Sequence, residues 1–293
     1  MVVIIFGFLF FTQHLSQDDF NNLKFNEGEA EAEHLEGIMK SQGIINKNLI
    51  IPPSNLPYKN RTTVSSGMTV DSVAVWIAPN PKDSLLFVTY KDGDMVSVWN
   101  FTTWTKFKDI TGIDYPNGVA VDQAEGTLYV TVRNSDIVAK YFISDILSQA
   151  NPTPVATFPT ADQPYGVTVY HNSGNSYIYT TALDGSGRDT VTAFTSFGAI
   201  NTTFNITHAD ESIEADEDNN VLYIDDENAI DVKEYTLNGT YLRTFGQGNF
   251  TGTSTPEGIE VYECDNDGYI IVSDQNANEF EIYDRNPPHA NLG

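Results

Sequence analysis

Thr255–Arg285 reads TPEGIEVYECDNDGYIIVSDQNANEFEIYDR, and this stretch decides the fold. It holds three short runs rich in apolar and β-branched residues, Gly258–Tyr262, Tyr269–Ser273 and Glu279–Tyr283. Acidic turns that carry Asn and Gly separate the runs, which is typical of strands joined by tight hairpins. The stretch therefore predicts an antiparallel unit of three strands.

The same layout occurs four more times upstream, and the central strands of the five copies start 43, 49, 45 and 47 residues apart. Each central strand has a short apolar strand before it and another, ending near an aromatic residue, after it. A repeat of about 40–50 residues with three or four strands is typical of a β-propeller blade. We expect an all-β propeller with five visible blades over residues 64–286. The central strands are Leu85–Val88, Leu128–Val130, Tyr177–Tyr179, Leu222–Ile224 and Tyr269–Ile271.

Composition is consistent with one large domain, because 293 residues that are 40% hydrophobic can bury a sizeable core. The net charge of −25 repels nucleic acid and anionic membranes and attracts cations. We therefore expect no nucleic-acid partner. A solubilising acidic surface explains the charge equally well.

The single cysteine, Cys264, excludes a disulfide within the chain, so packing and strand pairing must hold the fold.

The first 63 residues do not repeat. Val2–Phe11 is a run of ten apolar residues, too short for a transmembrane helix, so no membrane span is expected. We interpret residues 1–17 as a signal peptide, or alternatively as a retained strand, and residues 18–63 as an acidic linker with an extended arm. The Pro-punctuated part of this arm, Ile44–Pro57, is a candidate strand for self-assembly. Residues 287–293 are interpreted as a tail.

Six N-x-S/T sequons favour a secretory route and a secreted or extracellular protein, although some sequons arise by chance in a chain rich in Asn and Thr. The candidate glycosylation sites are Asn60, Asn100, Asn201, Asn205, Asn238 and Asn249.

Carboxylates gather at the expected blade turns, and equivalent turns of successive blades meet around the axis of a propeller. Glu211, Asp226 and Glu257 are therefore candidates to converge, although solvated turn residues are the alternative for each one. Such hard oxygen ligands suit Ca²⁺, which in turn activates water for attack on phosphorus. Glu263–Asp274 has a calcium-loop spacing, but its flanking β runs favour a plain hairpin. The histidines lack zinc-site spacing, and neither a serine-hydrolase nor a Walker motif occurs.

The segment from Asp71, DSVAVWIAPNPKDSLLFVTYKDGDMVSVWN, resembles the first blade of the β-propeller phytases, which have six blades. Further matches follow in the family order: VTVRNS around Arg133, YGVTVYHNSGNSYIY from Tyr165, ESIEADEDNNVLYIDDENAI from Glu211 and PEGIEVYECDNDGYIIVSDQNANEFEIYDR from Pro256. The resemblance implies a cleft lined by calcium ions, a calcium-bridged water that attacks a substrate phosphate, and basic residues that hold phosphates. It implies calcium ligands at Asp71, Glu211, Asp226, Glu227 and Glu257, with Glu211, Asp226 and Glu257 catalytic, and phosphate contacts at Lys91, Arg133 and Tyr165.

The chain departs from this family at three places. The family's Asp-x-Glu-Gly reads Thr255-Pro256-Glu257-Gly258, Leu183 stands where the family has a phosphate-binding Lys, and the last half-blade is absent.

Three functions remain open. The first is a calcium-dependent phosphomonoesterase acting on phytate or a similar polyphosphorylated substrate. The second is a non-catalytic, glycosylated extracellular propeller in a surface or filamentous assembly. The third rests on Tyr115–Asp122 (YPNGVAVD), which is similar to a motif of lactonase and strictosidine-synthase-like propellers.

Overall fold

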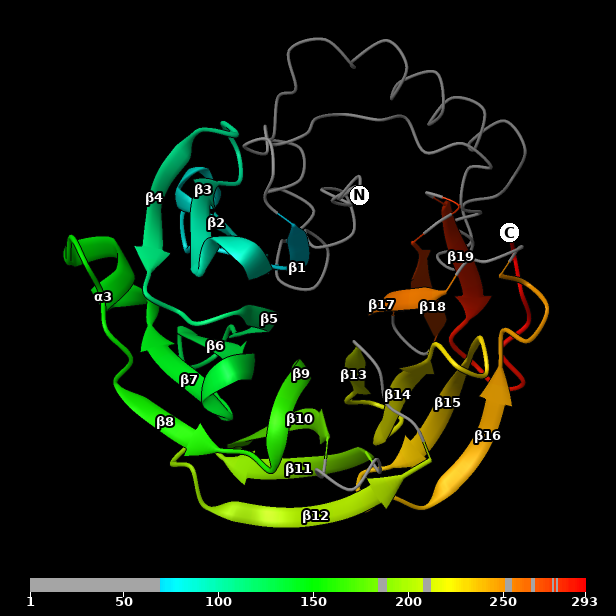
Figure 1. Ribbon diagram of the computed structural model, residues 1–293. Helices are drawn as coiled ribbons and strands as arrows, with labels where there is room; N and C mark the ends of the chain where they lie inside the picture. The colour runs from blue at the N-terminus through cyan, green and yellow to red at the C-terminus, as the bar shows by residue number, and fades with distance from the viewer. Residues whose placement is uncertain are drawn as a thin grey trace, which may run out of the picture.

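The computed structural model describes residues 69–183, 189–207, 212–250, 255–264, 267–275, 277 and 279–293. Our assignments for residues 1–63, and the expected start of the propeller near Val64, lie outside these residues. The described chain forms five antiparallel sheets arranged around a common axis, as Figure 1 shows in a view along that axis. The predicted all-β propeller with five blades is confirmed.

Strands follow one another in chain order within every sheet. The first sheet contains β1 (Val70–Trp76), β2 (Leu85–Tyr90), β3 (Met95–Asn100) and β4 (Lys106–Thr111). The second contains β5 (Pro116–Asp122), β6 (Thr127–Val132), β7 (Ile137–Phe142) and β8 (Ala156–Pro159). The third contains β9 (Asp162–Asn172), β10 (Asn175–Leu183), β11 (Asp189–Thr195) and β12 (Ile200–Ile206). The fourth contains β13 (Ile213–Asp216), β14 (Val221–Asp226), β15 (Asp231–Thr236) and β16 (Tyr241–Phe245), and the fifth β17 (Pro256–Cys264), β18 (Asp267–Asp274) and β19 (Glu279–Asp284).

Helical structure is scarce in the described residues. It consists of α3 (Ile143–Ser148) and three single turns of 3₁₀ helix, η1 (Pro81–Asp83), η2 (Lys91–Gly93) and η3 (Arg133–Ser135). No helix among the described residues has the length and apolar character that a membrane crossing requires.

The first strand of every sheet lies next to the axis and the last strand lies at the rim (Figure 1). Successive inner strands β1, β5, β9, β13 and β17 contact one another around the axis. The five central strands expected from the repeat are the second strands β2, β6, β10, β14 and β18. Because every sheet is a simple meander, all inner strands run in the same direction, so their first residues share one end of the ring.

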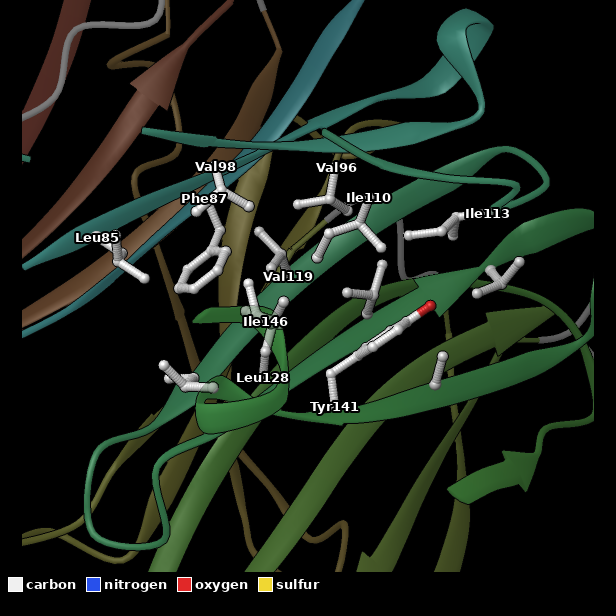
Figure 2. Close-up of a cluster of buried hydrophobic side chains, with 14 residues drawn as sticks. Leu85, Phe87, Val96, Val98, Ile110, Ile113, Val119, Leu128, Tyr141 and Ile146 are labelled. Atoms are coloured by element: carbon white, nitrogen blue, oxygen red, sulfur yellow. The ribbon is translucent and has the colours of Figure 1, made fainter. Parts of the chain in front are cut away.

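Apolar side chains fill the space between neighbouring sheets. Figure 2 shows the cluster between the first and second sheets, where Phe87 and Ile110 meet Leu128 and Ile146. All four side chains are buried, and each contributes about 1.5–3 kcal/mol on burial. Similar clusters lie between the later pairs of sheets, so packing joins the ring blade by blade.

The fifth sheet differs from the others at its outer edge. Its three strands are followed by residues 286–293, and the end of this segment pairs with β19: Leu292 donates to the Ile282 carbonyl (2.7 Å) and Ile282 donates to the Gly293 carbonyl (3.1 Å). The segment expected to be a tail thus lies where the other sheets have a fourth strand. The Glu263–Asp274 segment is the predicted hairpin, because Glu263 pairs with Gly268 across β17 and β18.

Candidate functional site

Four inner strands share a bulge near their first residue. Pairing with the second strand shifts between Val70 and Val73 in β1, between Pro116 and Val119 in β5, between Pro164 and Val167 in β9, and between Pro256 and Ile259 in β17. Bulges re-aim side chains and are frequent next to binding sites. The first residue of each bulge is, in the same order, Asp71, Asn117, Tyr165 and Glu257. In the sequence repeat, the equivalent residue of the fourth blade is Glu211, which lies outside the described residues.

One hydrogen bond recurs beside this position in all five blades. The N–H of the next residue donates to a side-chain oxygen near the end of the second strand, at distances of 2.7–3.0 Å. The pairs are Ser72 with Thr89, Gly118 with Thr131, Gly166 with Thr181, Ser212 with Asp225, and Gly258 with Ser273. A small residue is required at Gly118, because a Cβ there would lie 2.5 Å from the Tyr165 carbonyl oxygen. The same local backbone geometry therefore recurs at this position in every blade.

A second set of equivalent positions lies two residues beyond those side-chain oxygens. It consists of Lys91, Arg133, Leu183, Glu227 and Gln275. The site residues inferred from the sequence therefore fall on two repeated sets of positions at the same end of the ring, with Asp226 directly before Glu227. The partners of each side chain are described next.

In the first and fifth blades, the two positions are joined within the blade. Lys91 forms an ion pair with Asp71, and both side chains are nearly buried, at 10% and 3% exposure. In the fifth blade, Gln275 Nε2 donates to Glu257 Oε1 at 2.5 Å. Lys91, expected to contact phosphate, thus already has a carboxylate partner.

Asp226 also forms its ion pair and its hydrogen bond within its own blade. Its side chain is 1% exposed and forms an ion pair with Lys233, and it accepts a hydrogen bond from the Ala229 N–H at 2.8 Å. No three His, Cys, Asp or Glu side chains gather into a metal-binding group among the residues that the structure describes. Glu211, one of the calcium ligands that the resemblance implies, lies outside the described residues, so calcium binding stays a prediction.

Arg133 stands apart from the other charged residues at this end. Its Nε and Nη2 donate to Gln163 Oε1 at 3.2 and 3.1 Å, and Nη2 also donates to the Tyr165 hydroxyl. Its guanidinium carbon lies 4.2 Å from the centre of the Tyr165 ring and 5.7 Å from that of Tyr115. Within the described ranges, no carboxylate forms an ion pair with this side chain. Among the described residues, this half-buried cation is therefore held by two aromatic rings, a tyrosine hydroxyl and an amide oxygen.

Sequence reasoning missed two neighbours of Arg133. Tyr115 and Gln163 each precede a proline at the start of an inner strand, and both have a positive φ, at 58° and 34°. Non-glycine residues with positive φ are uncommon and mark sites of local constraint. Asn117 is fully buried, and neither atom of its amide has a hydrogen-bond partner in the described part of the chain. The Tyr-Pro and Gln-Pro steps were the available signal.

The opposite end of the inner strands carries charged residues that join the blades. His171 Nε2 lies 3.1 Å from Asp122 Oδ1 of the second blade, and Nδ1 lies 2.5 Å from Glu217 Oε1 of the fourth. Hydrogen bonds to Asp122 and then to Glu217 raise the pKa of His171 to about 10. His171 is therefore a cation at neutral pH, and it joins three blades.

The fourth and fifth blades are joined by Arg285, which is 2% exposed. It donates to Asp216 Oδ2 at 2.7 Å, to Asp218 Oδ2 at 3.2 Å and to Glu263 Oε1 at 2.8 Å. The first two blades are joined without charge, since Gln123 accepts from the Ile77 N–H and donates to the Val75 carbonyl.

Two carboxylates lie on the inner strands between these ends. Burial, and then repulsion from Glu260, raises the pKa of Glu214 well above its ordinary value, and Thr168 donates to Glu214 at 3.0 Å. Burial raises the pKa of Glu260 to about 8. At neutral pH this pair therefore holds a proton more readily than exposed glutamates do.

Comparison with protein-family models finds no match, and comparison with curated proteins finds none either. Solved structures share the fold. Hydrazine synthase of Kuenenia stuttgartiensis is 14% identical, with a TM-score of 0.57 over 80% of this chain and 68% of the other. A streptogramin B lyase is 12% identical (TM-score 0.53, 76% and 67%), and a chain of a nidogen–laminin complex is 13% identical (TM-score 0.58, 80% and 84%). At these identities the likeness establishes the propeller fold alone.

Proposed function

We propose that this chain is a secreted binding propeller that holds a phosphorylated small molecule, such as phytate, at the junction of its second and third blades. One observation carries the proposal: Arg133 has two tyrosine rings and Gln163 around it, but no carboxylate among the described residues. A guanidinium presents a planar fork of donors that matches two phosphate oxygens. Binding such an anion would neutralise the cation.

The net charge of −25 opposes this binding only at long range. Interactions between exposed charges are screened beyond about 8 Å at physiological ionic strength, so contacts at the site decide the affinity. Tyr165 and Tyr115 shield the guanidinium from water on their side, which strengthens its interaction with an anion.

Calcium-dependent phosphomonoester hydrolysis is the second candidate. It is favoured by the repeat, which puts Asp71, Asp226 and Glu257 at one end of the ring. Against it, Asp71 and Asp226 each form an ion pair with a lysine, and Glu257 accepts from Gln275. Metal binding would have to displace those partners, so we rank non-catalytic binding first.

Isothermal titration calorimetry with inositol hexakisphosphate tests the proposal. Arg133→Gln is expected to weaken binding by about tenfold or more, because hydrogen bonds to a charged group contribute about 1.5–3 kcal/mol. Arg133→Lys keeps the charge but loses the fork, and should give an intermediate affinity. Lys106→Gln on β4, at the rim, is the matched control and should bind as the parent does.

The two candidates separate when phosphate release is assayed with and without calcium. Binding without release supports the binding protein, and release that depends on calcium supports the enzyme. If the parent protein binds no inositol phosphate, or if Arg133→Gln binds as tightly as the parent, the proposed site is wrong. In that case the non-catalytic propeller of a surface or filamentous assembly, with its N-terminal arm as the assembly element, becomes the leading proposal.

A further inference from the structure

Among the described residues, the outermost strand of each four-stranded sheet pairs on one side only, so β4, β8, β12 and β16 have no strand on their outer edge there. Exposed edges invite pairing with other chains, and proteins protect them with charge, proline or short length. Three of the four follow this rule. Strand β4 carries Lys106, Lys108 and Asp109, β8 has four residues and ends in Pro159, and β16 has five residues with Arg243 near its centre.

Strand β12 has none of these features. It reads INTTFNI, without charge or proline, and its seven residues make it the longest of the four. Its pairing partner is β11, at the inner side of the sheet. Ile200 at its start is 63% exposed, and Phe197 in the preceding turn is 93% exposed. Uncharged β-rich segments of six or seven residues are prone to edge-to-edge association.

What β12 has instead is two sequons, Asn201-Thr202-Thr203 and Asn205-Ile206-Thr207. Both asparagines are exposed. Asn201 also lies in a bulge, because β11 pairs with Ile200 and then with Thr202. Both side chains therefore have room for a covalent group after folding.

The sequon at Asn100 has a different environment. The Asn100 Nδ2 donates to the Lys82 carbonyl at 2.7 Å, and its Oδ1 accepts from the N–H groups of Thr102 and Thr103 at 3.1 and 2.7 Å. A sugar on Asn100 Nδ2 would disturb this turn. The sequons therefore differ in how accessible the asparagine amide is in the folded chain. The two on β12 have exposed asparagines and lie on a strand edge that carries neither charge nor proline.

We propose that N-linked oligosaccharides on Asn201 and Asn205 protect the edge of β12 and keep the propeller from associating through it. In the secretory pathway, each Asn Nδ2 forms a bond to the anomeric carbon of the first sugar of a lipid-linked oligosaccharide. That carbon loses its bond to the lipid diphosphate, which leaves, and the amide gives up one proton. This proposal is independent of the ligand site at Arg133.

The test is expression of the full chain in a eukaryotic secretory host, followed by peptide mass mapping before and after enzymatic deglycosylation. Both Asn201 and Asn205 should carry sugar. The double variant Asn201→Gln/Asn205→Gln should then scatter light several-fold more than the parent at equal concentration. Asn238→Gln removes an exposed sequon from the turn between β15 and β16, and should scatter as the parent does.

A second variant separates edge protection from any other effect of the sugars. Asn201→Lys/Asn205→Lys removes both sequons but returns charge to the edge, so it should remain monodisperse without sugar. Absence of sugar at both residues in the secreted protein would overturn the proposal. So would a Gln double variant that remains as monodisperse as Asn238→Gln, or a Lys double variant that associates as much as the Gln variant.

Discussion

The two ends of the inner strands use charged residues in opposite ways. At the ends where the inner strands begin, the ion pairs described above, Asp71–Lys91 and Asp226–Lys233, each lie within one blade. At the far ends, His171 and Arg285 bond to carboxylates of neighbouring blades. One end thus fastens the ring with charge. The end where the inner strands begin is joined between blades by packing and by hydroxyl contacts to the backbone, such as that of Thr131 Oγ1, which donates to the Tyr165 carbonyl at 2.6 Å.

The largest effect is expected at Arg285. Arg285→Met removes a buried cation and leaves Asp216, which is fully buried, without its ion-pair partner. Breaking a buried pair on one side costs about 3–5 kcal/mol of unfolding free energy. Urea denaturation followed by fluorescence would measure the loss. The exposed pair Lys106–Asp109 supplies the control, because Lys106→Gln should cost less than about 1 kcal/mol. Equal effects of the two substitutions would contradict the fastening role of the far end.

His171 is expected to give a smaller effect that depends on pH. Its folded pKa of about 10 lies above the ordinary value of 6.5, so its contribution is complete below about pH 6.5 and is lost as pH rises toward 10. The side chain is 32% exposed, so solvent screening limits the contribution to about 1–2 kcal/mol.

His171→Gln should therefore be less stable than the parent near pH 6, and the difference should shrink to near zero by about pH 10. Thermal unfolding at several pH values, with buffer ionisation corrected, measures this difference. A gap between parent and variant that stays constant from about pH 6 to about pH 10 would show that His171 acts through packing instead of charge.

The repeat and its register were predictable because each blade has the same pattern of short apolar runs separated by polar turns. The spaced apolar runs placed all five central strands, and the family resemblance singled out Asp71, Tyr165 and Glu257, which the structure shows at equivalent bulges of their inner strands. Whether those residues hold calcium or phosphate stays a prediction. The repeat specifies which positions share an end of the ring, but not which side chains pair there.

The contacts between blades were not predictable in the same way. Asp216, Glu217 and Glu263 resemble solvated turn residues in an acidic chain, and only the angle between adjacent sheets brings Arg285 to Asp216. His171 likewise has no local signal, because its partner Asp122 is contributed by the preceding blade. The last segment was missed for a different reason: β19 has an edge, and a short polar segment satisfies it through backbone groups that carry no sequence signature.

The smallest effect is expected where the inner strands begin, in the fifth blade. Gln275→Ala removes the Nε2–H donor that lies 2.5 Å from Glu257 Oε1, but both side chains are half-buried and water can replace the donor. The cost should therefore be below about 1 kcal/mol, much less than that of Arg285→Met. The same urea titration measures it. A loss comparable to that of Arg285→Met would mean that this end also fastens the ring. The contrast between a fastening end and a ligand-binding end would then fail.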